Sequence, residues 1–249
     1  MDAAERLPPP VQVLNAEGAS PYVLLCEHAS RFIPSAYEGL GLEAGDLSRH
    51  IAWDIGAAEV ATTLSATLDA PLVMAGYSRL LIDLNRPPNS PTAIPEISES
   101  TVIPGNIGLA AEERARRIAC YFDPFQRAVT TLLDERKAAG RPATIIGVHS
   151  FTPVYKGFAR PWVAGILYRK SQRFGHALAQ ALGGPEQGIA ENEPYQIEDD
   201  SDYTVPVHGE ARGLDAVLVE LRQDLIGETE GAAAWAVRLG RALMACAAA

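Results

Sequence analysis

Cysteine is scarce in this sequence, and its placement excludes two kinds of site. The 249 residues include only Cys26, Cys120 and Cys246, and no two of them form a CxxC pair. A thiolate zinc site needs closely spaced cysteines, and a disulfide framework needs several of them in a short secreted chain. We therefore expect reduced thiols and neither kind of site.

The chain also lacks clusters of basic residues. Its 21 lysines and arginines are outnumbered by 31 acids, which gives a formal net charge of −10. Such a surface repels a phosphate backbone, and no run of Lys and Arg offers a local basic face, so we expect no nucleic-acid partner. The motifs GxGxxG and GxxxxGK[ST] are absent as well. Nucleotide cofactors therefore have no support in the sequence.

Neither a secretory leader nor a long apolar run is present. The N-terminal region carries Pro8 to Pro10 and lacks the basic segment followed by an apolar one that a secretory signal requires. The Ala-rich stretch 231–249 is interrupted by Arg238 and Arg241, which favours an amphipathic helix over a membrane span. We expect a cytoplasmic protein that does not enter a membrane.

What is present is typical of a soluble α/β enzyme. Hydrophobic residues make up 47% and charged residues 21%, and the length suits one domain over residues 1–249. Apolar runs predict strands at 22–26, 72–75, 80–84, 143–148, 162–168 and 215–221. Helical spacing predicts helices at 54–68, 112–139 with an interruption at Pro124, 171–182 and 231–249. Because strands alternate with helices, we expect a layered α/β fold with helices on both faces of a parallel or mixed sheet.

Polar side chains follow three of the expected strands. His28 comes after the run 22–26, Asn85 and Arg86 after 80–84, and His149 after 143–148. Ligands of α/β sheets bind beyond the carboxyl ends of the strands, so we expect these groups to meet there. Residues 85–108 are rich in Pro, Ser, Asn and Gly and have no periodicity, which favours a lid over the same place.

Two of these residues suit a catalytic zinc ion, which takes about three nitrogen or oxygen ligands and leaves one position open. His28 and His149 are the candidate nitrogens, and a hydrogen-bonded structural role is the alternative for each. An HxxE spacing is ruled out because Arg31 stands three residues after His28. The carboxylate is then Asp54 or Glu27. We prefer Asp54, since Glu27 should face the other way on an extended backbone.

The remaining candidates are a base and groups that bind substrate. Glu220 is the only acid in the run 216–221, and apolar surroundings raise a carboxyl pKa, which suits a general base, although an outward-facing acid is equally compatible. Arg79 and Arg86 could pair with a substrate carboxylate or belong to structural ion pairs. His208, in a Gly-containing turn after the acidic stretch 198–202, could reach the substrate. No GxSxG motif supports a serine hydrolase.

One long motif resembles a known family. Tyr77 to Arg86 reads YSRLLIDLNR and closely resembles the YSR-x-[VL]-I-D-L-N-R segment of N-formylglutamate amidohydrolases. Glu27 to Ser30 is similar to the family's P-H-S-G, and Val148 to Ser150 to its A-H-S. Residues 208–209 and 218–223 are similar to its H-Y-G and L-E-L-x-Q region. The resemblance extends from about residue 21 to about residue 226.

The resemblance implies a fold and a set of roles. The family is related to zinc exopeptidases of the carboxypeptidase and aspartoacylase type, and the implied fold is a three-layer α/β sandwich around a mixed sheet of about eight strands. It implies one zinc ion on His28 and His149, and Glu220 as the general base. Asn85 and Arg86 would hold the substrate's carboxylate. We add Arg79 as a group near the oxyanion, with Ser150 and His208 at the substrate.

Family members release formate and glutamate from N-formylglutamate, and the resemblance implies a small N-acyl amino acid as substrate. Two departures concern that substrate. Glu27 and Ser30 replace the Pro and Gly of P-H-S-G, and the acidic run 198–202 replaces a segment with Gly and Lys or Arg. We therefore expect a substrate less anionic than N-formylglutamate. A carboxypeptidase-like or amidase activity on peptides or cell-wall fragments, and a non-catalytic binding protein, are the alternatives.

Overall fold

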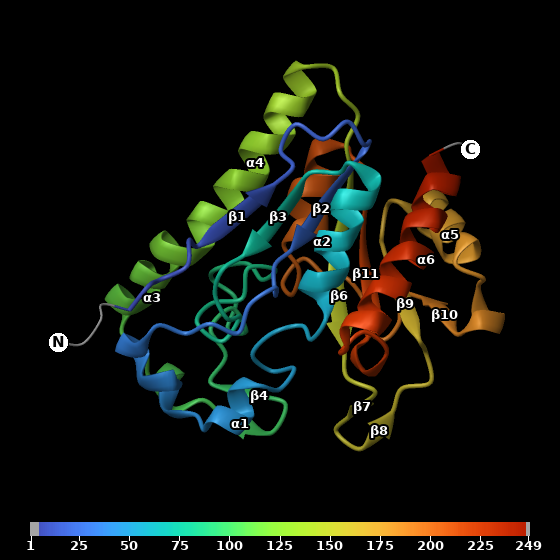
Figure 1. The fold of residues 1–249 in the computed structure, drawn as a ribbon. Coiled ribbons are helices and arrows are strands. Elements are labelled where there is room, and N and C mark those ends of the chain that lie inside the picture. The colour runs from blue at the N-terminus through green and yellow to red at the C-terminus, as the bar shows by residue number, and fades with distance from the viewer. Residues whose placement is uncertain (1–4, 248–249) are drawn as a thin grey trace.

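A seven-stranded mixed sheet runs through the protein, as Figure 1 shows. The structure is a computed structural model, and it describes residues 5–247. The order across the sheet is β1-β3-β2-β6-β11-β9-β10. The strands are β1 (Val11–Leu14), β2 (Tyr22–Cys26), β3 (Leu72–Ala75), β6 (Thr144–Phe151), β9 (Ala164–Leu167), β10 (Ile189–Glu191) and β11 (Ala216–Arg222).

The sheet combines a parallel centre with reversed edges. Strands β3, β2, β6 and β11 are parallel, β1 is antiparallel to β3, and β9 is antiparallel to β11. Parallel strands are covered on both faces, which explains why β2 is buried at all five positions and reads as one apolar run. The mixed sheet expected from the resemblance is confirmed, with seven strands instead of about eight.

Helices cover both faces and complete three layers (Figure 1). On one face, α2 (Ala57–Leu68), α5 (Gln172–Ala181) and α6 (Thr229–Ala247) pack on the core that contains Leu24. On the other face, α4 (Asp123–Ala138) packs on the core that contains Val23 and Leu25. Successive strand residues point to opposite faces, so one strand contributes to both cores.

The helix expected at 112–139 is present and interrupted. It divides into α3 (Ala111–Arg117), a π-helical turn (Ile118–Phe122) and α4, with Pro124 in the first turn of α4. Proline has no N–H for the preceding turn, and the wider turn accommodates that loss. The helix expected at 231–249 is α6, and residues 248 and 249 lie outside the described part. Within that part, no helix is long and apolar enough to cross a membrane.

The prediction of a strand at residues 80–84 is wrong. This segment forms turns, in which Leu81 N–H bonds to the Ser78 carbonyl at 3.0 Å and Asp83 N–H bonds to the Ala93 carbonyl at 2.7 Å. The preceding strand β3 already has β1 and β2 on its two edges, so no edge remains for a further strand there. The apolar side chains are buried all the same. The turn carries the polar residues that follow it to the end of the sheet.

Shorter elements complete the chain. They were not expected from the sequence, because segments of two to seven residues carry too little periodicity. They are α1 (Ala44–Leu47), the hairpins β4 (Ile97–Ser98) with β5 (Thr101–Val102) and β7 (Val154–Tyr155) with β8 (Phe158–Ala159), the 3-10 turns Ser35–Gly41, Pro104–Asn106, Pro185–Gln187, Glu210–Arg212 and Gln223–Leu225, and the π turn Thr204–Gly209.

Candidate metal centre and active-site cavity

A cavity of about 540 Å³ opens beyond the carboxyl ends of β2, β6 and β11, where an α/β sheet places its ligands. Eight of the nine site residues expected from the sequence line it, and His208 is the exception. The eight are His28, Asp54, Arg79, Asn85, Arg86, His149, Ser150 and Glu220. Segments far apart in the sequence therefore meet at one place, as expected for strand ends.

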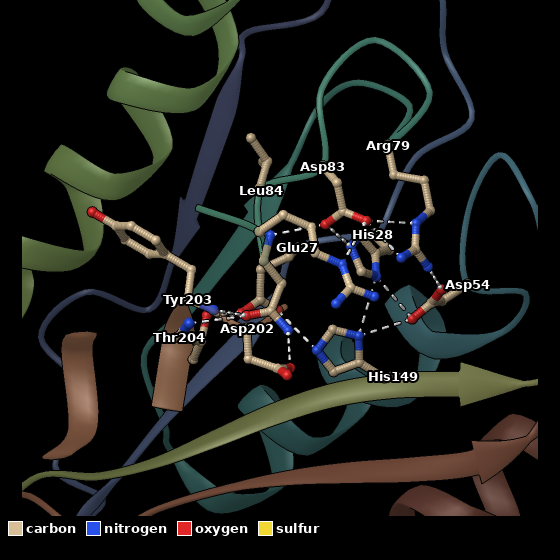
Figure 2. A network of polar contacts seen from close by, with 12 residues as sticks. Glu27, His28, Asp54, Arg79, Asp83, Leu84, His149, Asp202, Tyr203 and Thr204 are labelled. Carbon is tan, nitrogen blue, oxygen red and sulfur yellow. Dashed lines mark hydrogen bonds and ion pairs between the residues drawn. The ribbon is translucent and has the colours of Figure 1, made fainter. Parts of the chain in front are cut away.

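Three of these residues converge on one point (Figure 2). His149 Nδ1 lies 2.9 Å from Asp54 Oδ2 and 3.2 Å from His28 Nδ1, and His28 Nδ1 lies 3.3 Å from Asp54 Oδ2. Donor atoms bonded to a tetrahedral zinc at about 2.0–2.2 Å are separated by about 3.3–3.6 Å. The three atoms lie at or slightly inside this spacing, and the cluster could bind a metal ion.

The far nitrogens of both imidazoles face carboxylates. His28 Nε2 lies 2.7 Å from Asp83 Oδ1, and His149 Nε2 lies 3.2 Å from Glu27 Oε2. Histidines that bind metals commonly hold a carboxylate on the other ring nitrogen, which orients the ring. Glu27 also accepts a hydrogen bond from the Thr204 hydroxyl. Of the two candidate carboxylate ligands, Asp54 faces the convergence point and Glu27 lies behind His149.

The electrostatics of the cluster favour a positive charge there. Burial lowers the pKa of His149, but the Glu27 charge and the hydrogen bond with Asp54 more than offset it, so the pKa is raised well above its usual value. Burial raises the pKa of Asp54, yet the two histidines hold it far below its usual range. The carboxylate therefore remains ionised, as a metal ligand must be.

Arg79 braces two carboxylates of the site. Its Nη1 lies 3.3 Å from Asp54 Oδ1, and its Nη2 and Nε donate to Asp83 Oδ2 at 2.6 and 3.0 Å. Burial raises the pKa of Asp83, but Arg79 and then His28 bring it well below its usual value. One guanidinium thus holds both the inward acid and the acid behind His28 in place, while it still lines the cavity.

Glu220 stands beside His149 on the neighbouring strand, because the two residues are register partners in the parallel pair β6 and β11. Its side chain is buried, and its Oε2 has no hydrogen-bond partner in the described part of the chain. Burial, with a smaller contribution from the Asp54 charge, raises the pKa of Glu220 to about 7. A carboxyl group with this pKa can both accept and return a proton near neutral pH.

Asn85 and Arg86 hold a neighbouring segment of the protein. Asn85 Oδ1 accepts from the N–H groups of Tyr203 and Thr204 at 3.2 and 2.9 Å, and its Nδ2 lies 3.3 Å from Asp202 Oδ1. Arg86 Nη1 donates to the Ser201 carbonyl. The Asn85 amide is therefore engaged on both sides, and Glu198, Ser201 and Asp202 of the acidic stretch line the cavity. Figure 2 shows Asp202 beside Tyr203 and Thr204.

Ser150 and His208 lie differently from each other. The Ser150 N–H donates to Asp54 Oδ2 at 3.2 Å, and its buried hydroxyl has no hydrogen-bond partner within residues 5–247. His208 Nε2 lies 2.7 Å from Gln126 Oε1 on α4. Burial, with a contribution from the Arg212 charge, lowers the His208 pKa to about 4, so the ring is neutral. The structure does not bring His208 to the cavity.

Three residues of the site were not identified as such from the sequence. Asp83 stands between Arg79 and Asn85 in the YSRLLIDLNR motif, and its position inside a matched motif was an available signal. Thr204, which binds Glu27, and Tyr195, which lines the cavity, had no sequence signal. They come from a loop and a π turn, whose position depends on contacts with distant residues.

Fold and site together define a class of protein: a three-layer α/β fold with a buried cluster of two histidines and one aspartate at the strand ends. The chain belongs to the N-formylglutamate amidohydrolase family, whose pattern matches residues 20–227. The family consists of hydrolases, in agreement with the resemblance of the YSRLLIDLNR segment. No sequence among the curated proteins matches the chain.

Two solved structures share the fold over nearly the whole chain. A gene product of Agrobacterium tumefaciens is 40% identical, with a TM-score of 0.93 over 97% of this chain and 96% of that one. The N-formylglutamate amidohydrolase of Ralstonia eutropha is 18% identical, with a TM-score of 0.64 over 96% of this chain and 97% of that one. At that identity the second likeness concerns the fold alone.

Proposed function

We propose that this protein is a zinc-dependent amidohydrolase that cleaves the amide bond of an N-formyl or other N-acyl amino acid. The products are formate, or the corresponding carboxylic acid, and the free amino acid. The observation that carries the proposal is the convergence of His28 Nδ1, His149 Nδ1 and Asp54 Oδ2 in the cavity that Glu220 also lines. Membership of an amidohydrolase family supports the type of bond.

The metal ligands are His28, Asp54 and His149, with Asp83 and Glu27 orienting the two rings from behind. A zinc ion held by these residues would supply Lewis-acid activation of the amide carbonyl and of the attacking water. The ring nitrogens that face the carboxylates carry the protons, which leaves both Nδ1 atoms as lone-pair donors. Arg79 keeps Asp54 in its inward orientation.

Glu220 performs both proton transfers. It removes a proton from the attacking water as the water oxygen bonds to the carbonyl carbon. It then returns that proton to the amide nitrogen, so that the C–N bond breaks and a neutral amine leaves. It is buried on the same face of the sheet as His149, its register partner, and its raised pKa suits both roles.

Two arginines and a serine interact with the substrate. Arg79 lines the cavity at the metal cluster, and its charge stabilises the carbonyl oxygen as it becomes negative. Arg86 has one terminal nitrogen, Nη2, without a protein partner within the described residues, and this nitrogen binds the α-carboxylate. The unpaired Ser150 hydroxyl offers a further hydrogen bond.

Metal analysis combined with the variant Glu220→Gln tests the proposal. Protein purified without chelator should contain about one zinc per chain, and Glu220→Gln should keep the zinc while it loses turnover of N-formyl and N-acetyl amino acids. A non-catalytic binding protein would show the same ligand affinity in both forms and turnover in neither. Full activity in protein stripped of metal would falsify the proposal.

A further inference from the structure

The charged side chains that line the active-site cavity are mostly acidic. Two guanidiniums, Arg79 and Arg86, are outnumbered by six carboxylates, those of Asp54, Asp83, Glu99, Glu198, Asp202 and Glu220. Asp54 and Asp83 are paired with Arg79 and the two histidines, and Glu99 is paired with Arg49, so the uncompensated excess lies at Glu198 and Asp202. Concave walls of low dielectric concentrate such a field, so the excess acts on any charged molecule that enters.

The two arginines leave room for one substrate carboxylate and no more. Arg79 is engaged by Asp54 and Asp83 on its three nitrogens. Arg86 donates to the Ser201 carbonyl and lies 4.0 Å from Asp83, which leaves its Nη2. No lysine lines the cavity. The second carboxylate of a dicarboxylate such as N-formylglutamate would therefore face acids, since no further Lys or Arg among residues 5–247 lines the cavity.

The acidic side of the cavity, Glu198 with Asp202, is held in position by the site itself. Asp202 Oδ2 accepts from the Glu198 N–H at 3.1 Å, and its Oδ1 lies 3.3 Å from Asn85 Nδ2. Arg86 fastens the same turn through Ser201. We call these two acids the acidic wall. The Glu198 carboxylate has no hydrogen-bond or ion-pair partner in the chain between residues 5 and 247, so it is available to a ligand.

A second feature of the cavity also points to a ligand. Glu220 is only 6% exposed and lines the cavity, yet its Oε2 has no hydrogen-bond partner among the described residues. A buried, unsatisfied carboxylate oxygen is costly unless a bound molecule completes its hydrogen bonding. The acidic wall thus belongs to a cavity that is shaped for an occupant and is not merely an acidic patch of surface.

We propose that the acidic wall recognises a positive charge, and that the substrate is an N-acyl derivative of a basic amino acid. Arg86 binds its single α-carboxylate, and Glu198 binds the cationic side chain. Repulsion by the wall rejects a side-chain carboxylate, since specificity is built as much from unfavourable contacts with the wrong ligand as from favourable ones. This inference rests on the proposed amide hydrolysis and adds the substrate class.

Kinetics of the zinc-loaded protein test the charge preference. N-formyl-L-arginine, N-formyl-L-glutamine and N-formyl-L-glutamate differ in side-chain charge and share the bond to be cleaved. We expect kcat/KM to fall in that order, by about 100-fold from the first to the last at low salt, and the differences to shrink as ionic strength rises. Equal or faster turnover of N-formyl-L-glutamate would overturn the inference.

A matched pair of variants locates the preference. Glu198→Gln should reduce the ratio of kcat/KM for the arginine derivative over the glutamine derivative by about three- to tenfold. Asp200→Asn removes a charge from the same acidic stretch, but Asp200 does not line the cavity, so the ratio should stay constant. An unchanged ratio in Glu198→Gln, or an equal change in both variants, would show that the acidic wall does not select the charge of the substrate's side chain.

Calorimetry separates failure of this inference from failure of the proposed function. Zinc-loaded Glu220→Gln is titrated with L-arginine and with L-glutamate, which differ only in the side chain. If arginine binds more tightly while no N-acyl amino acid is hydrolysed by the natural protein, the charge preference stands and amide hydrolysis is wrong. If N-formylglutamate is hydrolysed and glutamate binds more tightly, amide hydrolysis stands and the proposed preference of the acidic wall for a positive charge is wrong.

Discussion

The two ends of the active-site cavity differ in how their charges are compensated. At the metal end, His28 and His149 each face a carboxylate, and Arg79 braces Asp54. At the acidic wall, Glu198 is exposed and has no partner in the described part of the chain. The metal end stands on strand ends, and the wall stands on a loop. The comparison suggests that buried groups held near the strand ends set the chemistry and that accessible groups on the loop select the substrate.

The largest effect is expected from the removal of a proposed metal ligand. His149→Ala removes one of three ligands and leaves Glu27 buried without its partner, so we expect loss of zinc and a fall in activity of more than about 1,000-fold. Metal content and turnover measure this. His176→Ala is the control, because His176 is exposed on α5 and, within residues 5–247, pairs with Glu191 outside the cavity. Normal zinc content in His149→Ala would rule out the assigned ligand set.

The proton-transfer role of Glu220 predicts the next largest effect. Glu220→Gln has nearly the same shape but cannot accept a proton, so kcat should fall by about 100- to 10,000-fold with zinc still bound. Turnover that persists at the natural rate in this variant would exclude Glu220 as the base. In the natural protein activity should rise with pH as Glu220 ionises, and bound zinc should move that rise below the pKa of about 7 found without metal.

The pH dependence of the free energy of unfolding tests the raised pKa of Glu220 without any substrate. The Glu220 pKa is raised from 4.5 to about 7 in the folded metal-free protein, so the folded state keeps a proton that the unfolded chain has lost. Stability should therefore fall as pH rises from about 4.5 to 7, by on the order of 3 kcal/mol. Glu220→Gln should lack this part of the loss and keep the part that comes from the raised pKa values of His28 and His149. Urea unfolding of both metal-free proteins at pH 5 and pH 8 measures it, and an equal change in the free energy of unfolding in both would contradict the raised pKa.

Glu27 offers a smaller test of how the metal end is supported. Glu27→Gln keeps the shape behind His149 but removes the charge that orients the ring, so zinc affinity should fall by about 10- to 100-fold. Competition with a chromogenic chelator measures the affinity. Glu17→Gln, at an exposed acid, is the matched control and should leave affinity unchanged. If Glu27→Gln abolished binding altogether, Glu27 would be a ligand and not a support.

Much of this site could be anticipated from residue order. The apolar runs of β2, β6 and β11 are continuous because both faces are covered, and His28, His149 and Glu220 stand at or near their ends. The choice of Asp54 over Glu27 as the carboxylate ligand was harder to make from the sequence. Side-chain alternation on an extended backbone gave only a small preference for Asp54, because the positions of both carboxylates depend on the turns that follow the strands.

The sequence by itself determined the layered fold, the core strands and helices, and the set of polar residues at the strand ends, because periodicity and punctuation are local properties of the chain. Only the tertiary structure decided that residues 80–84 form turns and not a strand of the sheet. It also decided that the Asn85 side chain hydrogen-bonds to residues 202–204, and that His208 contacts Gln126 on α4. The first depends on whether an edge of β3 is left unpaired in the sheet, and the other two depend on side chains from distant parts of the chain. The contact between Asn85 and Tyr203, for example, joins residues more than a hundred positions apart.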